Sequence, residues 1–249
     1  MKKLTVTKRE IFADYIPMAA TALCILYFAI VRQQPFIQAF PLLVSLYVQY
    51  LTAHANRWSF VVGGTNSIVY AIGFMMLRTY FSAIQSVLIS APLQYVSFFL
   101  WKKNAKAGDK ISSRLRFLSL PWQVTCVLGT VALWLSLYFV FTPLFADASF
   151  PLMDSFVFAM GVISPILSAF RFVEAQYYSL VSQVVYALMW ILISFTDPSC
   201  INYVLISVYG LYRVIEASVN WTRLYLAQRK DGLAETQTAH NVPREQSGV

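Results

Sequence analysis

Charged residues are scarce in this chain. Only 12% of its 249 residues are Asp, Glu, Lys or Arg, whereas an ordinary soluble domain carries about 25%. Hydrophobic residues make up 58%, and the mean hydropathy is +0.60. This composition excludes a typical soluble domain and predicts an all-α polytopic membrane protein that has the lipid bilayer as its surroundings.

Cysteine and histidine are also rare. Cys24, Cys126 and Cys200 are far apart and odd in number, and they form no CxxC pair, so the sequence predicts neither a disulfide framework nor a cysteine metal site. The two histidines are His54 and His240. The GxxxxGK[ST] phosphate loop is absent too, which argues against a nucleotide hydrolase. We therefore expect no catalytic residue, metal or cofactor, and a protein that is not an enzyme.

Long apolar segments of membrane-spanning length fill most of the chain. The first of them ends in no clear small-residue cleavage site and is followed by others, so we interpret it as a membrane helix and not as a signal peptide. About eight transmembrane helices are expected, at 15–31, 37–54, 58–77, 80–101, 122–143, 150–170, 175–195 and 200–222.

The positive charges follow an alternating pattern along this series. With the N-terminus in the cytoplasm, the lysines and most arginines fall in the N-terminal segment, the inner loops or the C-terminal tail, and the largest group is KKNAKAGDKISSRLR after Trp101. Arg32 and Arg78 fall outside, and Arg213 lies within the last segment. The asymmetry obeys the positive-inside rule, so we expect both termini in the cytoplasm. It also accounts for the net charge of +8 without a nucleic-acid partner.

Two parts of the chain resemble each other. NSIVYAIGF (66–74) is similar to SQVVYALMW (182–190), and the preceding segments open with FPLLVS and FPLMDS. We interpret them as three-helix repeats that run parallel because one linker helix joins them, with chance similarity between apolar helices as the alternative. The expected organisation is an N-terminal basic segment and first helix (1–36), a first repeat (37–101), a basic loop and linker helix (102–149), a second repeat (150–228) and a disordered cytoplasmic tail (229–249).

A polar stripe crosses one of the apolar segments, RFVEAQYYSLVSQVVYALMW (171–190). Gln176, Ser179 and Gln183 are spaced so that a helix places them on one face. An unpaired amide in hydrocarbon costs several kcal/mol, so this face must point to other helices or to a polar cavity.

Two further segments carry polar residues at helical spacing, one around Asn66 and one along 80–101. We expect these faces to converge with the stripe and to hydrogen-bond an uncharged polar solute at mid-membrane. The alternative is that the amides only join helices, at about 0.6 kcal/mol per contact. The candidate solute-binding residues are Asn66, Gln85, Ser86, Gln94, Gln176, Ser179 and Gln183.

Over residues 35–225 the chain resembles the PnuC family of nicotinamide riboside transporters. The resemblance rests on GGTNSIVYA (63–71), APLQYVSFFLWKKN (91–104) and DSFVFAMGVISPILSAFRFVE (154–174). It implies a SWEET-like fold with a three-one-three helix core, in some members after an extra N-terminal helix, and a homotrimer in the cell inner membrane. It also implies facilitated diffusion, or uniport, of a vitamin or nucleoside that phosphorylation then traps inside the cell.

One departure from the family pattern concerns the solute. After the glutamate that matches Glu174, the family has tryptophans two and five residues on and an asparagine nine residues on, where this chain has Gln176, Ser179 and Gln183. Gln183 keeps an amide, but two flat aromatic surfaces are missing. Thiamine, riboflavin or a deoxynucleoside therefore stands beside nicotinamide riboside as a possible solute.

The acidic residues bear on the transport mode. Asp154 is expected to start its own helix from the outer side, and Arg213 and Glu216 to pair near the cytoplasmic membrane edge. No carboxylate lies clearly in the middle of a span, whereas proton and sodium couplers usually need one. An uncoupled uniporter is favoured, and a membrane scaffold or sensor without transport is the alternative of another class.

Overall fold

The computed structural model describes residues 8–103, 115–144 and 148–240. Within these ranges the chain forms helices and no strand, apart from an isolated bridge between Arg116 and Phe172. The elements are α1 (Lys8–Val31), α2 (Phe36–Ala53), α3 (Trp58–Met76), α4 (Tyr80–Gln85), η1 (Ser86–Ser90), α5 (Ala91–Lys103), α6 (Leu120–Ser136), η2 (Leu137–Phe141), η3 (Thr142–Leu144), α7 (Pro151–Ala169), α8 (Glu174–Thr196), η4 (Pro198–Cys200) and α9 (Ile201–His240).

The helices agree with the expected membrane segments. In the described part of the chain, seven are long and apolar enough to cross a membrane, namely Phe12–Val31, Phe36–Ala53, Trp58–Met76, Tyr80–Lys103, Leu120–Leu144, Pro151–Ala169 and Glu174–Thr196. α9 is more polar because it carries Asn202, Arg213 and Glu216, yet its first half packs against α1, α2 and α8 within the bundle. The predicted all-α membrane fold is confirmed.

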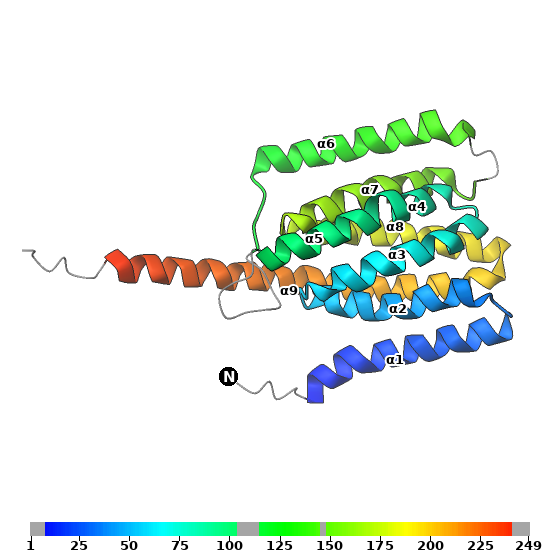
Figure 1. Ribbon diagram of the computed structural model, residues 1–249, viewed down its shortest axis with the longest axis horizontal. Helices are drawn as coiled ribbons and strands as arrows, with labels where there is room; N and C mark the ends of the chain where they lie inside the picture. The colour runs from blue at the N-terminus through cyan, green and yellow to red at the C-terminus, as the bar shows by residue number, and fades with distance from the viewer. Residues whose placement is uncertain (1–7, 104–114, 145–147, 241–249) are drawn as a thin grey trace, which may run out of the picture.

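Two groups of three helices form the centre of the bundle (Figure 1). α2 packs against α3 and against α9, and α7 packs against α8 and against α4 and α5, so the first helix of each group contacts the last helix of the other. Each connection reverses the chain, which makes α2 and α7 parallel. α6 links the groups and packs on α7, while α1 packs on α2 and α9 at the opposite edge. This is a three-one-three arrangement with one additional N-terminal helix.

Four helices end in the same way. Gln33, Ala55, Arg78 and Arg171 have positive φ angles of 48, 51, 58 and 67°, and in each case the N–H of the next residue donates to the carbonyl five residues earlier. This is the Schellman stop, which usually uses glycine because other residues are strained in the left-handed region. The short connections therefore carry no glycine signal at the positions where the helices stop.

The expected helix 80–101 is interrupted by the π-helical turn η1. Pro92 lies two residues after this turn. A proline has no N–H and clashes with the carbonyl four residues before it, which favours a wider turn. An added residue in a turn rotates the following helix by about 100°. Gln85 and Gln94 consequently face different neighbours, α7 and α3 respectively.

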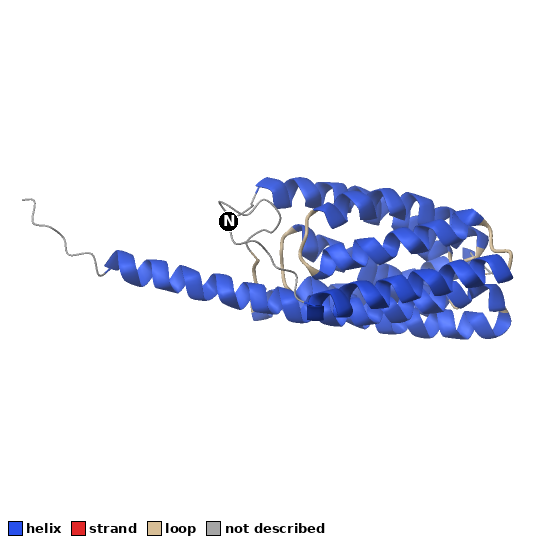
Figure 2. Ribbon diagram, turned by 90° about the horizontal axis from the view of Figure 1, so that it is seen from below, coloured by secondary structure: helices blue, strands red, loops and turns tan. Residues whose placement is uncertain are grey.

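α9 is longer than a membrane span. Its 40 residues correspond to about 60 Å, against about 30 Å of hydrocarbon, and its second part projects beyond the bundle (Figures 1 and 2). The prediction of a disordered tail is wrong for residues 229–240, because helix-forming residues there extend a helix that is already nucleated. Residues 241–249 lie outside the described residues, as do 104–114 of the basic loop.

Candidate solute-binding site

The polar stripe on α8 faces a cavity between α2, α8 and α9. Gln176 is only 3% exposed, and the Ser179 hydroxyl lies 2.6 Å from the Ser164 hydroxyl of α7. The cavity has a volume of about 160 Å³, and its lining residues are Gln49, Thr52, Gln176, Ser179, Gln183, Gly210, Arg213, Val214 and Ala217. Amide and hydroxyl groups on this wall can both donate and accept hydrogen bonds.

A second cavity continues along α8. Its volume is about 200 Å³, and it is lined by Phe74, Ser82, Gln85, Val157, Gly161, Ser182, Gln183 and Tyr186. Gln183 therefore borders both cavities. Their combined volume reaches the lower end of the range of about 300–1,000 Å³ that is typical of small-molecule sites.

A glycine lets the amide of Gln183 approach α9 closely. Gln183 Nε2 donates to the Ser207 carbonyl at 3.0 Å, and a Cβ at Gly210 would lie 2.7 Å from this nitrogen and 3.3 Å from Gln49 Nε2. The amides of α2 and α8 thus meet over the bare backbone of α9. Any side chain at position 210 would push them apart.

The side-chain amide of Gln85 packs against Gly161, a glycine of the other three-helix group. Its Nε2 donates to the Gly161 carbonyl of α7 at 3.1 Å and also to the Ser90 hydroxyl. Beyond Gln183 the wall is aromatic, and the buried rings of Trp190 and Tyr203 stack with centroids 4.2 Å apart. The polar space consequently lies along the N-terminal half of α8, and aromatic packing fills the bundle along its C-terminal half.

The other predicted site residues join helices. Asn66 Nδ2 donates to the Pro41 carbonyl and to the Ser45 hydroxyl of α2, both at 2.9 Å. Gln94 Nε2 donates to the Ser67 hydroxyl of α3 at 3.1 Å.

The hydroxyl of Ser86 donates within its own helix, to the Ser82 carbonyl at 2.8 Å. Neither Ser86 nor the amides of Asn66 and Gln94 are among the residues that line the two cavities. The structure thus brings Gln85, Gln176, Ser179 and Gln183 together along one polar space and places the other three predicted residues in contacts between or within helices.

Sequence reasoning missed Gln49 and Arg213 as cavity residues. Gln38 and Gln49 are eleven residues apart in a mostly apolar segment, a spacing that keeps both on one helix face, so the signal for Gln49 was present. The signal for Arg213 was its position deep within the last segment.

Arg213 is the centre of a charged network and is only 1% exposed. Its Nη1 lies 2.9 Å from Asp14 Oδ1 and 2.6 Å from Glu216 Oε2. The predicted pair with Glu216 therefore forms. Asp14 belongs to α1, which is far away in sequence, and its part in the network could not be read from the local pattern.

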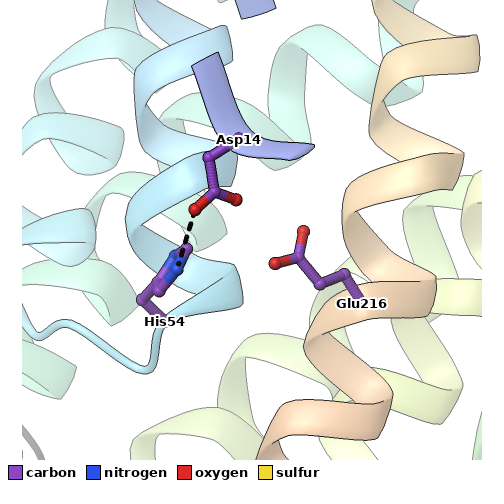
Figure 3. A group of neighbouring side chains, drawn as sticks. All are labelled: Asp14, His54 and Glu216. Atoms are coloured by element: carbon purple, nitrogen blue, oxygen red, sulfur yellow. Dashed lines mark ion pairs between the residues drawn. The ribbon is translucent and has the colours of Figure 1, made fainter. Parts of the chain in front are cut away.

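Asp14, His54 and Glu216 point toward one another from α1, the end of α2 and α9 (Figure 3). One ligand atom from each lies within 4.8 Å of the others, and the three border an open cavity of about 670 Å³ at this end of the bundle. Carboxylate and imidazole groups are metal ligands, but Nη1 of Arg213 already contacts both carboxylates. We therefore assign the cluster to an ion-pair network.

Asp154 is fully buried at the other end of the bundle. Its carboxylate accepts hydrogen bonds from the N–H groups of Phe81 and Ser82 at 3.1 and 3.2 Å, and from the Ser82 hydroxyl. Asp154 lies in the first turn of its own helix α7, as expected. Its carboxylate does not cap that helix, however, but caps the N-terminus of α4, whose first N–H groups have no partner within that helix.

Comparison with known proteins agrees with this architecture. The family model described as nicotinamide mononucleotide transporter matches residues 35–223, and no curated protein matches the chain. Among solved structures, the crystal structure of the vitamin B3 transporter PnuC is similar at a TM-score of 0.72 and 14% sequence identity, over 87% of this chain and 92% of that chain. The resemblance to the PnuC family is confirmed. Since the family model spans both three-helix groups, the chain belongs to the nicotinamide mononucleotide transporter family, which consists of membrane transporters and not of enzymes.

Proposed function

We propose that this protein is a uniporter that equilibrates nicotinamide riboside, or a closely related vitamin or nucleoside, across the cell inner membrane. The observation that carries the proposal is the position of Gln183, whose amide borders two polar cavities within the bundle. Both are lined mainly by uncharged amide, hydroxyl and aromatic groups, which suit an uncharged polar solute or one with a delocalised charge.

The charges at the two ends support an orientation with both termini in the cytoplasm. α1 begins and α9 ends at the same end of the bundle (Figure 1), together with Arg57, Lys102 and Lys103, while Arg32 and Arg78 lie at the other end. The positive-inside rule assigns the more basic end to the cytoplasm. With this orientation the polar half of α8 lies nearer the cytoplasm, where phosphorylation would trap the solute.

Uniport is supported by the cavity walls. No carboxylate is among the described residues that line either cavity, whereas ion couplers usually place one at the site. The carboxylates of Asp14 and half-buried Glu216 are paired with Arg213, and that of buried Asp154 accepts hydrogen bonds from Phe81 and Ser82. By family resemblance we propose a homotrimer, in which each subunit contains a complete site.

Flux of labelled nicotinamide riboside into proteoliposomes tests the function directly. We expect downhill flux that imposed proton and sodium gradients do not change, and competition by unlabelled solute. Uphill accumulation driven by either gradient would refute uniport. If thiamine, riboflavin or a deoxynucleoside is transported and nicotinamide riboside is not, the protein is a uniporter of that other solute. If none of them is transported, a scaffold or sensor is favoured.

The missing aromatic pair gives a test of solute choice. In Gln176→Trp/Ser179→Trp, indole surfaces are added to the cavity wall, and stacking is worth about 0.5–1.5 kcal/mol. We therefore expect the preference for nicotinamide riboside over thiamine and riboflavin to rise by about two- to tenfold, measured as competition in the flux assay. The matched control is Tyr177→Trp, because Tyr177 is exposed and its hydroxyl bonds Thr222 outside the cavity. Unchanged competition would mean that these positions do not select the solute.

A further inference from the structure

One edge of the Arg213 guanidinium is unsatisfied. Nη1 is used by Asp14 and Glu216, but Nε and Nη2 are buried and have no hydrogen-bond partner among the residues that the structure describes. Leaving a buried donor without a partner destabilises a protein, so such groups in a native protein call for an explanation. Arg213 lines the first solute cavity, which offers one.

The faces of the guanidinium are already occupied. The rings of Tyr50, Tyr209 and Tyr212 have their centroids 5.2, 5.9 and 5.8 Å from its central carbon, within the range of cation–π contacts. The part without a partner is therefore the in-plane edge. Oε1 of Gln49, in the wall of the same cavity, is also buried without a partner among the described residues. A donor edge and an acceptor thus share one small chamber.

The charge of the network indicates which group this edge can bind. Two carboxylates oppose one guanidinium, which leaves one negative charge in excess when His54 is neutral. Arg213 consequently offers N–H donors without an excess of positive charge. An added anion would be repelled by the carboxylates in a poorly screened environment, whereas a neutral carboxamide or sugar hydroxyl would only gain hydrogen bonds.

The residue that holds Arg213 lies outside the family match. The match begins at residue 35, and Asp14 is in α1, which ends at Val31. Tyr212, next to Arg213, also reaches α1 through a hydrogen bond from its hydroxyl to the Ala13 carbonyl at 3.0 Å. The additional N-terminal helix is therefore tied to the wall of the solute cavity.

We propose that Arg213 binds the transported solute through its Nε and Nη2 edge, that it takes an uncharged group rich in oxygen acceptors, and that Asp14 of α1 positions it. The inference rests on the proposed transport function and names a contact within that site. Asp14 acts through Arg213 and is a positioning residue.

The first test compares Arg213→Lys with the wild type in binding and in flux, with nicotinamide riboside as the probe. Lysine keeps a cation between Asp14 and Glu216, so the protein should fold, but it lacks the planar donor edge. We expect the Kd and KM for nicotinamide riboside to rise at least about tenfold with little change in maximal flux. Arg32→Gln, at an exposed arginine of the opposite end, is the control and should match the wild type.

The outcomes of this test are distinguishable. Wild-type binding that Arg213→Lys leaves unchanged overturns the inference and leaves the proposed function standing. If the wild type neither binds nor moves the probe, the proposed function and the inference both fail.

The second test uses the charge of Asp14. Asp14→Asn keeps the shape of the side chain and removes the excess negative charge, so we expect the KM for nicotinamide riboside to rise several-fold. It should also relax discrimination against nicotinic acid riboside, the carboxylate analogue, by about three- to tenfold. A purely structural role would not move this ratio. An unchanged ratio would overturn the positioning role, and Asp197→Asn, at an exposed aspartate of the opposite end, is the control.

Discussion

Gln183→Leu is expected to reduce solute flux at least about a hundredfold while the protein remains folded in the membrane. Gln183 is the residue that borders both cavities, and its amide is the polar group that a solute would meet on passing from one to the other. Leucine has a similar size but cannot donate or accept a hydrogen bond. Sites built around hydrogen bonds lose factors of this size when the polar partner is removed. Flux into proteoliposomes, normalised to reconstituted protein, measures the effect.

Gln94→Leu is the matched comparison. It makes the same chemical change at a glutamine that bonds Ser67 of α3. If Gln94 only joins helices, flux persists and thermal stability falls slightly, by about the 0.6 kcal/mol of an average membrane hydrogen bond. Loss of flux in this variant would mean that Gln94 belongs to the solute-binding site after all. Wild-type flux in Gln183→Leu would remove Gln183 from it.

The largest expected loss of stability is that of Asp154→Ala. The fully buried carboxylate holds two backbone N–H groups of α4 and the hydroxyl of Ser82, and alanine would leave all of them without this acceptor. The loss of a helix cap, together with donors that stay buried without an acceptor, lowers the free energy of unfolding by about 2–4 kcal/mol in total. For a protein of this size we expect the Tm in detergent to fall by about 5–15 °C.

Asp197→Ala is the control for this effect. Asp197 also accepts hydrogen bonds at the start of a helical turn, from the N–H and hydroxyl of Ser199, but it is exposed. Water can replace the lost acceptor there, so the Tm should change by no more than about 2 °C. If Asp154→Ala were equally mild, the Asp154 carboxylate would not hold α4 to α7.

The length of the apolar segments was enough to predict the helices, because membrane spans leave a strong and local signal in the sequence. The expected ends of the segments at 54 and 77 lie within one residue of the observed ends of α2 and α3, Ala53 and Met76. What the sequence did not show is the left-handed conformation of Ala55 and Arg78 at these stops, which glycine usually supplies. The continuation of α9 past Arg229 was missed because a polar composition alone cannot show that a helix from the membrane extends into it.

The candidate site was predictable in part. Gln176, Ser179 and Gln183 lie on one helix, where periodicity alone determines the shared face, and they line one cavity. Gln94 was expected on the same side because it continues a four-residue spacing of polar residues along 80–101, whereas the π-helical turn rotates the helix before Gln94. The contact of Asp14 with Arg213 joins residues 199 positions apart, and nothing in a single sequence connects them.

The length of α9 has a mechanical consequence. The helix is continuous from Gly210, in the cavity wall, to His240 beyond the bundle, a distance of about 45 Å at 1.5 Å per residue. A rigid rod of that length works as a lever, so a tilt of about 5° at Gly210 would swing its far tip by about 4 Å. Small rearrangements around the solute would be magnified there, where a spectroscopic label could register them without touching the transport path.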